Sequence, residues 1–131
     1  MGVHVEWFDE EQTIVLYVFA GRWTWDEFYP VYETGIAMET AVSHRVDIIL
    51  DVQKSHAIPP NVIFHLKHIT DRQPPNVYLN MLITENKVMH AVFRTAIRFY
   101  PRIGEYFSFA PNYESALNAI HEARRLATSQ E

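Results

Sequence analysis

A polar segment that contains several potential catalytic groups follows an apolar, strand-like stretch near the middle of the chain. It reads Asp51-Val52-Gln53-Lys54-Ser55-His56 and offers a carboxylate, an amine, a hydroxyl and an imidazole. A hydrolase of the Ser-His-Asp type would need Asp51, Ser55 and His56 within hydrogen-bond reach of one another. Adjacent side chains of an extended segment point to opposite faces, and no Gly-flanked nucleophile elbow surrounds Ser55. We therefore expect no catalytic site and no enzyme activity.

The same segment has a second interpretation as a binding loop. Loops that follow buried strands often carry ligand contacts. We expect a polar loop in which Asp51 accepts hydrogen bonds from backbone amides. The candidates for contact with a ligand are Asp51, Lys54, Ser55, His56 and Asn61.

Two histidines and an aspartate, His65, His68 and Asp71, recur at a spacing of three on a predicted helix. Imidazole and carboxylate on one helix face could hold a divalent metal such as zinc. The HExxH pattern of helical zinc sites is absent, and Lys67 and Arg72 add positive charge nearby. We expect a solvated helix face, with no metal and no cofactor.

The segment Lys87–Tyr100 carries more apolar surface than one side of a surface helix needs. Its basic side chains form one narrow stripe at spacings of three and four: Lys87, His90, Arg94 and Arg98. The apolar side chains fall on both flanks of that stripe: Val88, Val92 and Phe99 on one, and Met89, Phe93, Ile97 and Tyr100 on the other. One flank can pack on a sheet. The other is either covered by a neighbouring helix or forms a protein interface edged by arginines.

We favour the interface, with a second copy of the chain as the simplest partner. The predicted contact residues are Phe93, Arg94, Ile97, Arg98 and Tyr100.

Composition excludes several classes of protein. The chain has 131 residues, a net charge of −5, 48% hydrophobic residues and no cysteine. This length and composition predict one domain with its own core rather than a disordered chain. The absence of cysteine excludes disulfides, thiolate metal sites and cysteine nucleophiles, and it fits a cytoplasmic location. The negative charge argues against nucleic-acid binding, no apolar run is long enough to span a membrane, and the isolated glycines exclude P-loop and Rossmann nucleotide sites.

The elements that must position these residues alternate between strands and helices. The apolar patterning predicts strands at Val3–Phe8, Thr13–Ala20, Val46–Val52, Val77–Thr84 and Tyr106–Ala110. It predicts helices at Trp25–Ala41, Asn61–Asp71, Lys87–Tyr100 and Tyr113–Leu126, with a loop at Gln53–Pro60, a turn at Pro101–Glu105 and a fraying tail from Ala127. The order β-β-α-β-α-β-α-β-α implies an α/β domain with an opening hairpin and a mixed sheet of about five strands, packed with about four helices.

The first helix has a well-marked start. Thr24 and Glu27 have the spacing of a capping box, and Phe28, Tyr32, Gly35 and Met38 share a face. Pro30 should bend this helix or shift its start. Trp23 and Trp25 straddle the cap, where they either pack on the preceding chain or rim a small-molecule pocket.

The element order, the Gly21–Glu27 segment before the first helix, the Ile48–Val52 strand and the Phe109–Leu117 ending resemble a STAS-type domain of the SpoIIAA-like group, the anti-sigma-factor-antagonist fold. The resemblance covers nearly the whole chain. It implies a non-catalytic module that binds other proteins in a bacterial regulatory setting. Anti-sigma antagonists carry a phosphorylatable Asp-Ser pair before the second helix. The matching stretch here, Ala57–Asn61, lacks it, so that switch is not carried over.

We therefore predict a homodimeric interaction module. The alternative is a carrier of a small apolar molecule or lipid, with an apolar pocket behind the loops at the strand ends, lined by Trp23, Trp25 and Tyr32.

Overall fold

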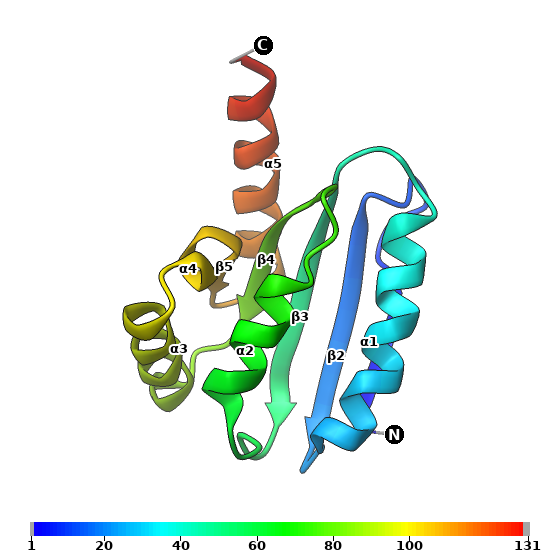
Figure 1. Cartoon of the computed structure of the whole chain (residues 1–131). Helices are drawn as coiled ribbons and strands as arrows, with labels where there is room; N and C mark the ends of the chain where they lie inside the picture. Colours follow the sequence, from blue (N-terminus) through cyan, green and yellow to red (C-terminus); the bar gives the residue numbers. More distant parts are fainter. Residues whose placement is uncertain (1, 130–131) are drawn as a thin grey trace.

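The computed structural model describes residues 2–129, in which five strands alternate with helices (Figure 1). The strands are β1 (Val3–Trp7), β2 (Ile14–Gly21), β3 (Val46–Ser55), β4 (Val77–Ile83) and β5 (Phe107–Ala110). The helices are α1 (Trp25–Thr40), α2 (Val62–Asp71), α3 (Lys87–Phe99), α4 (Arg102–Tyr106) and α5 (Tyr113–Ser129). The predicted α/β class and the predicted succession of five strands along the chain are confirmed.

The strands form a single mixed sheet in the order β1-β2-β3-β4-β5. β1 and β2 pair as an antiparallel hairpin, and every later neighbour pair is parallel. Each parallel pair is joined by a helical crossover, as the alternating pattern requires. Gly21 closes β2 with a φ of 65°, a conformation that glycine adopts at little cost.

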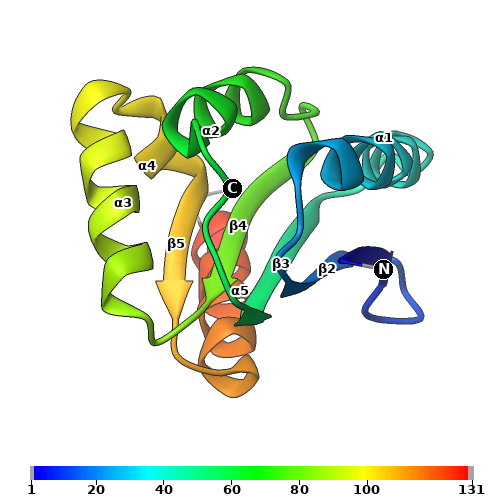
Figure 2. The same ribbon diagram turned by 90° about the horizontal axis from the view of Figure 1, so that it is seen from below.

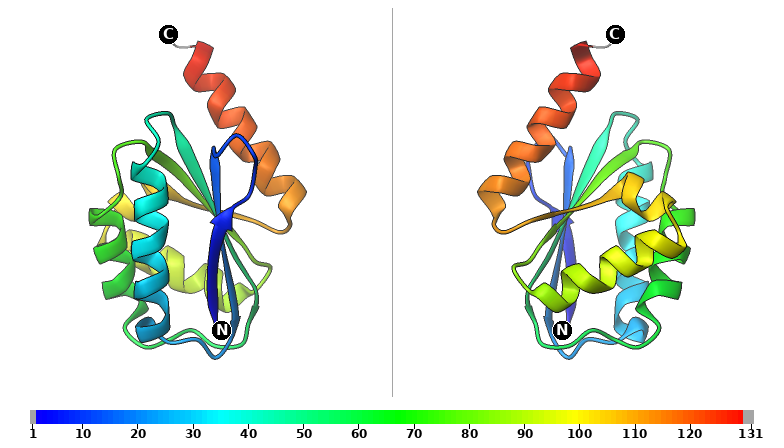
Figure 3. Two further views of the ribbon diagram at one scale, coloured as in Figure 1. Left: turned by 90° about the vertical axis from the view of Figure 1, so that its right-hand side faces the viewer. Right: turned by 90° about the vertical axis from the view of Figure 1, so that its left-hand side faces the viewer.

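Helices cover both faces of the sheet, but unequally. Figures 2 and 3 show α1, α2, α3 and α4 on one face and α5 on the other. Alternate side chains of β2 supply both layers: Val15, Tyr17 and Phe19 face α1, while Ile14 and Leu16 face α5. The larger core therefore lies on the face of the sheet that α1, α2, α3 and α4 cover.

The start of α1 follows the sequence signal. The Thr24 hydroxyl accepts a hydrogen bond from the Glu27 amide at 3.2 Å, and the Glu27 carboxylate accepts one from the Thr24 amide at 3.1 Å. This reciprocal capping box fixes the first helical residue at Trp25. Pro30 lies inside the continuous helix, so of the two predicted effects the shifted helix start is excluded.

Several element boundaries shift by one residue, and four differences need a physical explanation. An additional short helix, α4, replaces the expected turn because the fully buried Ile103 anchors that segment in the core, which makes five helices rather than four. β3 continues to Ser55 because Lys54 and Ser55 pair with the end of β2. α2 begins at Val62, since Asn61 has a left-handed backbone. α5 extends to Ser129, past the expected start of fraying; residues 130 and 131 lie outside the described range.

A buried carboxylate holds α5 to the sheet. Asp47 on β3 is fully buried and accepts hydrogen bonds from Arg124 Nε at 2.8 Å and from Arg45 Nη2 at 3.0 Å. Its Oδ1 also accepts from the Leu79 amide at 3.1 Å. Because each Asp47 oxygen has a charged or backbone donor, this buried charge is compensated.

Candidate functional site

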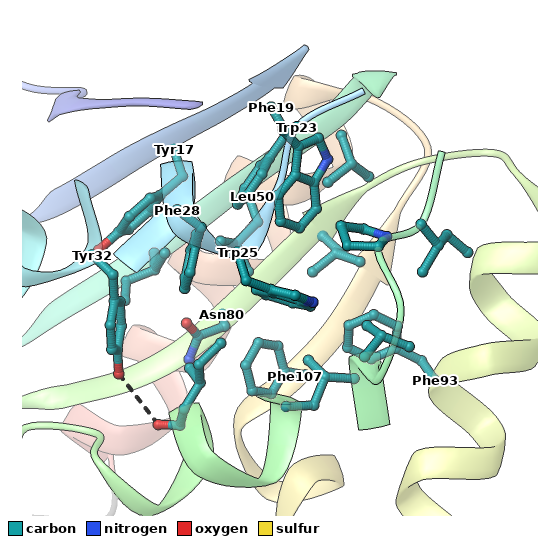
Figure 4. A pocket seen from close by; sticks show the side chains of 18 of the residues that line it. Tyr17, Phe19, Trp23, Trp25, Phe28, Tyr32, Leu50, Asn80, Phe93 and Phe107 are labelled. Atoms are coloured by element: carbon teal, nitrogen blue, oxygen red, sulfur yellow. Dashed lines mark hydrogen bonds between the residues drawn. The ribbon is translucent and has the colours of Figure 1, made fainter. Parts of the chain in front are cut away.

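A cavity lined by aromatic and aliphatic side chains lies between the sheet and the helices α1, α2 and α3 (Figure 4). The space in it that is open to the centres of water molecules has a volume of about 80 Å³. The strands contribute Tyr17, Phe19, Ile48, Leu50, Val52, Asn80, Leu82 and Phe107. The helices and their flanking loops contribute Trp23, Trp25, Phe28, Tyr32, Glu39, Ile58, Pro59, Val62, Leu66, Ile69, Gln73, Pro74, Met89 and Phe93. The three residues predicted for an apolar pocket, Trp23, Trp25 and Tyr32, are thus brought together around one cavity.

The floor of the cavity is the central strand β3. Ile48 and Val52 are buried there, but Leu50 between them remains only partly buried. A side chain in the middle of a central strand is normally covered by the helix above it. Leu50 is not fully covered, because the helices leave the cavity over it.

Trp23 and Trp25 form one wall, near the carboxyl ends of β2 and β3. Their rings meet edge to face with centroids 5.1 Å apart, and Trp25 also lies 5.6 Å from Phe28. Each indole N–H has a fixed acceptor: Trp23 donates to Ser55 Oγ at 2.9 Å and Trp25 to the Pro60 carbonyl at 2.7 Å. These bonds hold two large rings at the cavity while their apolar faces stay available.

Side-chain contacts join α1 to α2 above the cavity. Trp25 stacks on His65 with ring centroids 4.0 Å apart. Arg72 forms a two-pronged ion pair with Glu33, with N–O distances of 2.6 and 3.1 Å. The hydrogen bond from Arg72 lowers the pKa of Glu33, whereas burial lowers the pKa of His65. These aromatic and polar pairs therefore tie α1 to α2, and of their members only Trp25 lines the cavity.

Polar groups gather at the opposite end of the cavity. Glu39 is 1% exposed and Tyr17 is 2% exposed. Burial raises the pKa of Glu39 to about 8, so this carboxyl is mostly protonated at neutral pH. Burial, together with the nearby Glu39 carboxyl, also raises the pKa of Tyr17.

Sequence reasoning missed Glu39 by placing Met38 on the inner face of α1. The structure buries Glu39 there instead, in line with Phe28, Tyr32 and Gly35, and leaves Met38 partly exposed. The signal was present, because the spacing of four from Gly35 continues the same stripe to Glu39. Its charge made it look like a solvent-facing residue.

The ligand-loop candidates do not converge on this cavity. Asp51 lies on the face toward α5, where it accepts from the Tyr113 hydroxyl at 2.7 Å and from the Gln53 amide at 3.0 Å. The expected bond from a backbone amide to Asp51 is therefore present. Lys54 is exposed near the end of β3, and Asn61 is exposed with a φ of 61°.

The serine and histidine of the hydrolase hypothesis also have other surroundings. Ser55 Oγ donates to the Ala57 carbonyl at 3.0 Å, and His56 is exposed. Within residues 2–129 no hydrogen bond joins the side chains of Asp51, Ser55 and His56. The structure thus does not bring these three residues into a catalytic arrangement.

The proposed metal ligands on α2 have other partners as well. His65 is hydrogen-bonded to the Tyr29 hydroxyl, and Asp71 is paired with Lys67 at 2.7 Å and Arg102 at 3.2 Å. Over the described range, no group of three or more His, Cys, Asp or Glu side chains is placed to hold a metal ion.

The predicted contact residues of α3 divide between core and surface. Phe93 is only 4% exposed and packs against Phe107 and Phe109, so its prediction as a contact residue is wrong. Met89, Phe93 and Ala96 form the flank that packs in the core, because these positions face the sheet. Ile97 is partly buried, and Arg94, Arg98 and Tyr100 are exposed.

The second apolar flank of α3 remains at the surface. Val88 is 62% exposed and Phe99 is 70% exposed. No neighbouring helix among the described residues covers these two side chains.

Comparisons with known proteins agree with the architecture. The chain superimposes on an uncharacterised protein of the DUF3478 family with a SpoIIAA-like fold from Shewanella loihica PV-4, with a TM-score of 0.58 and 13% sequence identity. The match covers 88% of this chain and 89% of that chain. The fold is SpoIIAA-like. The predicted resemblance is thereby confirmed at the level of fold, the level that such low identity supports.

Other comparisons add no further identification to this SpoIIAA-like chain. No family model matches it. No curated protein matches it either. Among residues 2–129, none of the helices has both the length and the apolar character required to cross a bilayer.

Proposed function

We propose that this SpoIIAA-like protein binds a small apolar molecule in the cavity between α1, α2 and the sheet. The observation that carries the proposal is the partly buried Leu50 in the middle of the central strand. Compact domains close such positions with side chains, whereas binding proteins keep them open above an apolar floor.

The size and lining of the cavity support this function. The space open to water centres in the cavity is about 80 Å³. One water molecule needs roughly 10–15 Å³ of such space, so the cavity could hold about six water molecules. Each water molecule occupies roughly 30 Å³ in the liquid, so the volume that these waters would fill is about that of a bicyclic aromatic molecule. Most lining side chains are apolar, so water held there would have few hydrogen-bond partners, and an apolar ligand would be favoured.

The tryptophan wall supports access from the strand ends. Trp23, Trp25 and Ile58 are each partly exposed, whereas Tyr17 and Glu39 at the other end are buried. A ligand would therefore enter beside the tryptophans and extend toward Glu39.

The test is binding of 1-naphthylamine, an uncharged bicyclic dye whose emission depends on the polarity of its surroundings. Wild type should bind it saturably, and Leu50→Trp should abolish binding because the indole fills the cavity from its floor. Tyr78→Trp is the matched control, since Tyr78 is 53% exposed and outside the cavity lining. Equal dye binding by both variants would contradict the proposal.

A second candidate function, protein interaction, is supported by the exposed flank of α3. We infer that Val88 and Phe99 would form the apolar centre of a homodimer contact, with Arg94, Arg98 and Tyr100 at its rim. The partly buried Ile97 remains a candidate contact. This second proposal includes a bacterial regulatory setting, which rests on the resemblance to the SpoIIAA-like group. It also includes a cytoplasmic location, which rests on the absence of cysteine.

Sedimentation velocity tests the second candidate. Wild type should dimerise, and the double substitution Val88→Asp with Phe99→Asp should give a folded monomer. Tyr78→Asp, which changes an exposed aromatic side chain elsewhere, should leave the dimer intact. A wild type that is monomeric at high concentration would exclude this function.

A further inference from the structure

Two buried polar atoms at one end of the cavity lack hydrogen-bond partners. Within residues 2–129, neither the Tyr17 hydroxyl nor Glu39 Oε2 has a donor or acceptor in reach. Both side chains line the cavity and are at least 98% buried. Buried polar groups are satisfied in the great majority of cases, and each exception requires an explanation. Two exceptions at the same end of one cavity indicate a shared cause.

The position of the Tyr17 hydroxyl depends on a glycine. A Cβ placed on Gly35 would overlap the Tyr17 hydroxyl oxygen and lie 2.7 Å from Cζ of the same ring. The hydroxyl therefore reaches α1 only because residue 35 has no side chain. Glu39 follows one turn later on the same buried face of α1. Strand and helix together thus bring a hydroxyl and a carboxyl to the closed end of the cavity.

Two other polar side chains that line the cavity, Tyr32 and Asn80, have hydrogen-bond partners. Tyr32 donates to the Ile69 carbonyl at 3.4 Å, a long bond that Figure 4 shows at the side of the cavity. The Asn80 amide group donates to Gln73 Oε1 at 3.3 Å. These two side chains have partners, which leaves Tyr17 and Glu39 as the free groups.

The charge of this end decides which ligand group fits. Burial keeps the Glu39 carboxyl mostly protonated at neutral pH, and the Tyr17 phenol is neutral there, so each can both donate and accept a hydrogen bond. None of the lining residues that the structure describes is Lys, Arg or His. A ligand carboxylate would thus find no cation, and an ammonium group would need Glu39 to ionise at a desolvation cost.

We propose that Glu39 and Tyr17 bind an uncharged hydroxyl group at one end of an otherwise apolar ligand. One hydroxyl can accept from the carboxyl and donate to the phenol oxygen, which satisfies both buried groups. This inference rests on the proposed function, since it assigns the end group of the molecule held in the same cavity.

The test compares three probes with the same bicyclic body: naphthalene, 2-naphthol and 2-naphthoate. Each competes with 1-naphthylamine at about pH 6.5, where the dye, 2-naphthol and Glu39 are all uncharged. 2-Naphthol should bind about tenfold more tightly than naphthalene, the effect of one to two net hydrogen bonds. 2-Naphthoate should bind more weakly than either, because its charge would be buried without a partner.

Variants assign the preference to the two side chains. Glu39→Leu should bind naphthalene as well as wild type does but lose most of the preference for 2-naphthol. Tyr17→Phe provides an independent variant should Glu39→Leu not fold, and it should lose part of the preference. Glu33→Gln, at an exposed position on the same helix, is the control and should keep the preference.

The outcomes separate the two proposals. If wild type binds naphthalene and 2-naphthol equally, the hydroxyl assignment is wrong and the apolar-ligand function stands. Tightest binding of 2-naphthoate would also overturn the assignment. If neither the dye nor naphthalene binds, the proposed function fails and the assignment fails with it.

Discussion

Replacing Glu39 with glutamine should change how the stability of this protein depends on pH. Glu39 is 1% exposed, and burial raises its pKa from 4.5 to about 8. Between these two values the folded protein holds a proton on Glu39 that the unfolded chain has released. The free energy of unfolding therefore falls as pH rises through this window. The amide side chain of the Glu39→Gln variant cannot ionise, so that variant lacks this loss.

The size of the effect follows from the two pKa values. The contribution of Glu39 to the unfolding free energy decreases by about 1.4 kcal/mol for each pH unit within the window. Wild type should therefore lose about 2.5 kcal/mol relative to Glu39→Gln between about pH 5 and pH 7. Above about pH 8 the difference should level off, because Glu39 is then ionised in both states.

Urea denaturation followed by circular dichroism at several pH values measures this difference. Other titrating groups are common to both proteins, so the difference isolates Glu39. Glu33→Gln is the control: hydrogen bonding to Arg72 lowers the pKa of Glu33, so its contribution is lost only as pH falls below the ordinary carboxyl range. Parallel wild-type and Glu39→Gln curves from about pH 5 to pH 8 would refute the reasoning, because they would mean that Glu39 titrates as a solvated carboxyl.

Three further predictions concern packing and binding. Gly35→Ala should lower the unfolding free energy by about 1–3 kcal/mol, because its Cβ would meet the Tyr17 ring, and Tyr17→Phe should restore part of the loss in the double variant; full additivity in urea denaturation would contradict this. Arg124→Ala should lower the unfolding free energy by about 2–3 kcal/mol, because buried Asp47 loses one charged donor. Arg125→Ala removes an exposed ion pair and should change the unfolding free energy little. Equal effects of the two substitutions would exclude a stabilising role of the buried Asp47–Arg124 pair. 2-Naphthol at about ten times its Kd should raise the unfolding free energy by about 1.4 kcal/mol, which is measured as a higher melting temperature. An unchanged melting temperature would contradict binding.

The features that sequence predicted well depend on local patterns. Thr24 and Glu27 indicated the start of α1 because a capping box involves only neighbouring residues. Apolar patterning located all five strands: central strands such as β2 and β3 are buried on both faces and give continuous apolar runs, whereas β1 alternates between buried and more exposed residues. The strand order in the sheet could not be predicted, since it depends on how crossovers pack rather than on local composition.

The features that sequence missed depend on distances between elements. The cavity exists because α1 and α2 leave the central strand partly uncovered at Leu50, which no local pattern encodes. Phe93 was assigned to the wrong flank of α3 because periodicity gave two apolar flanks without indicating which faces the sheet. α4 was missed because five residues are too few for a periodic signal, and its anchor Ile103 is recognisable only from its burial.

The indole resonances of the three tryptophans provide the most direct test of the apolar-ligand site. In a ¹H–¹⁵N correlation spectrum, saturating naphthalene should shift the indole N–H signals of Trp23 and Trp25, which line the cavity, and leave that of Trp7, which does not. Shifts confined to backbone amides near Val88 and Phe99 on α3, with unchanged Trp23 and Trp25, would place the ligand on the surface and contradict the account.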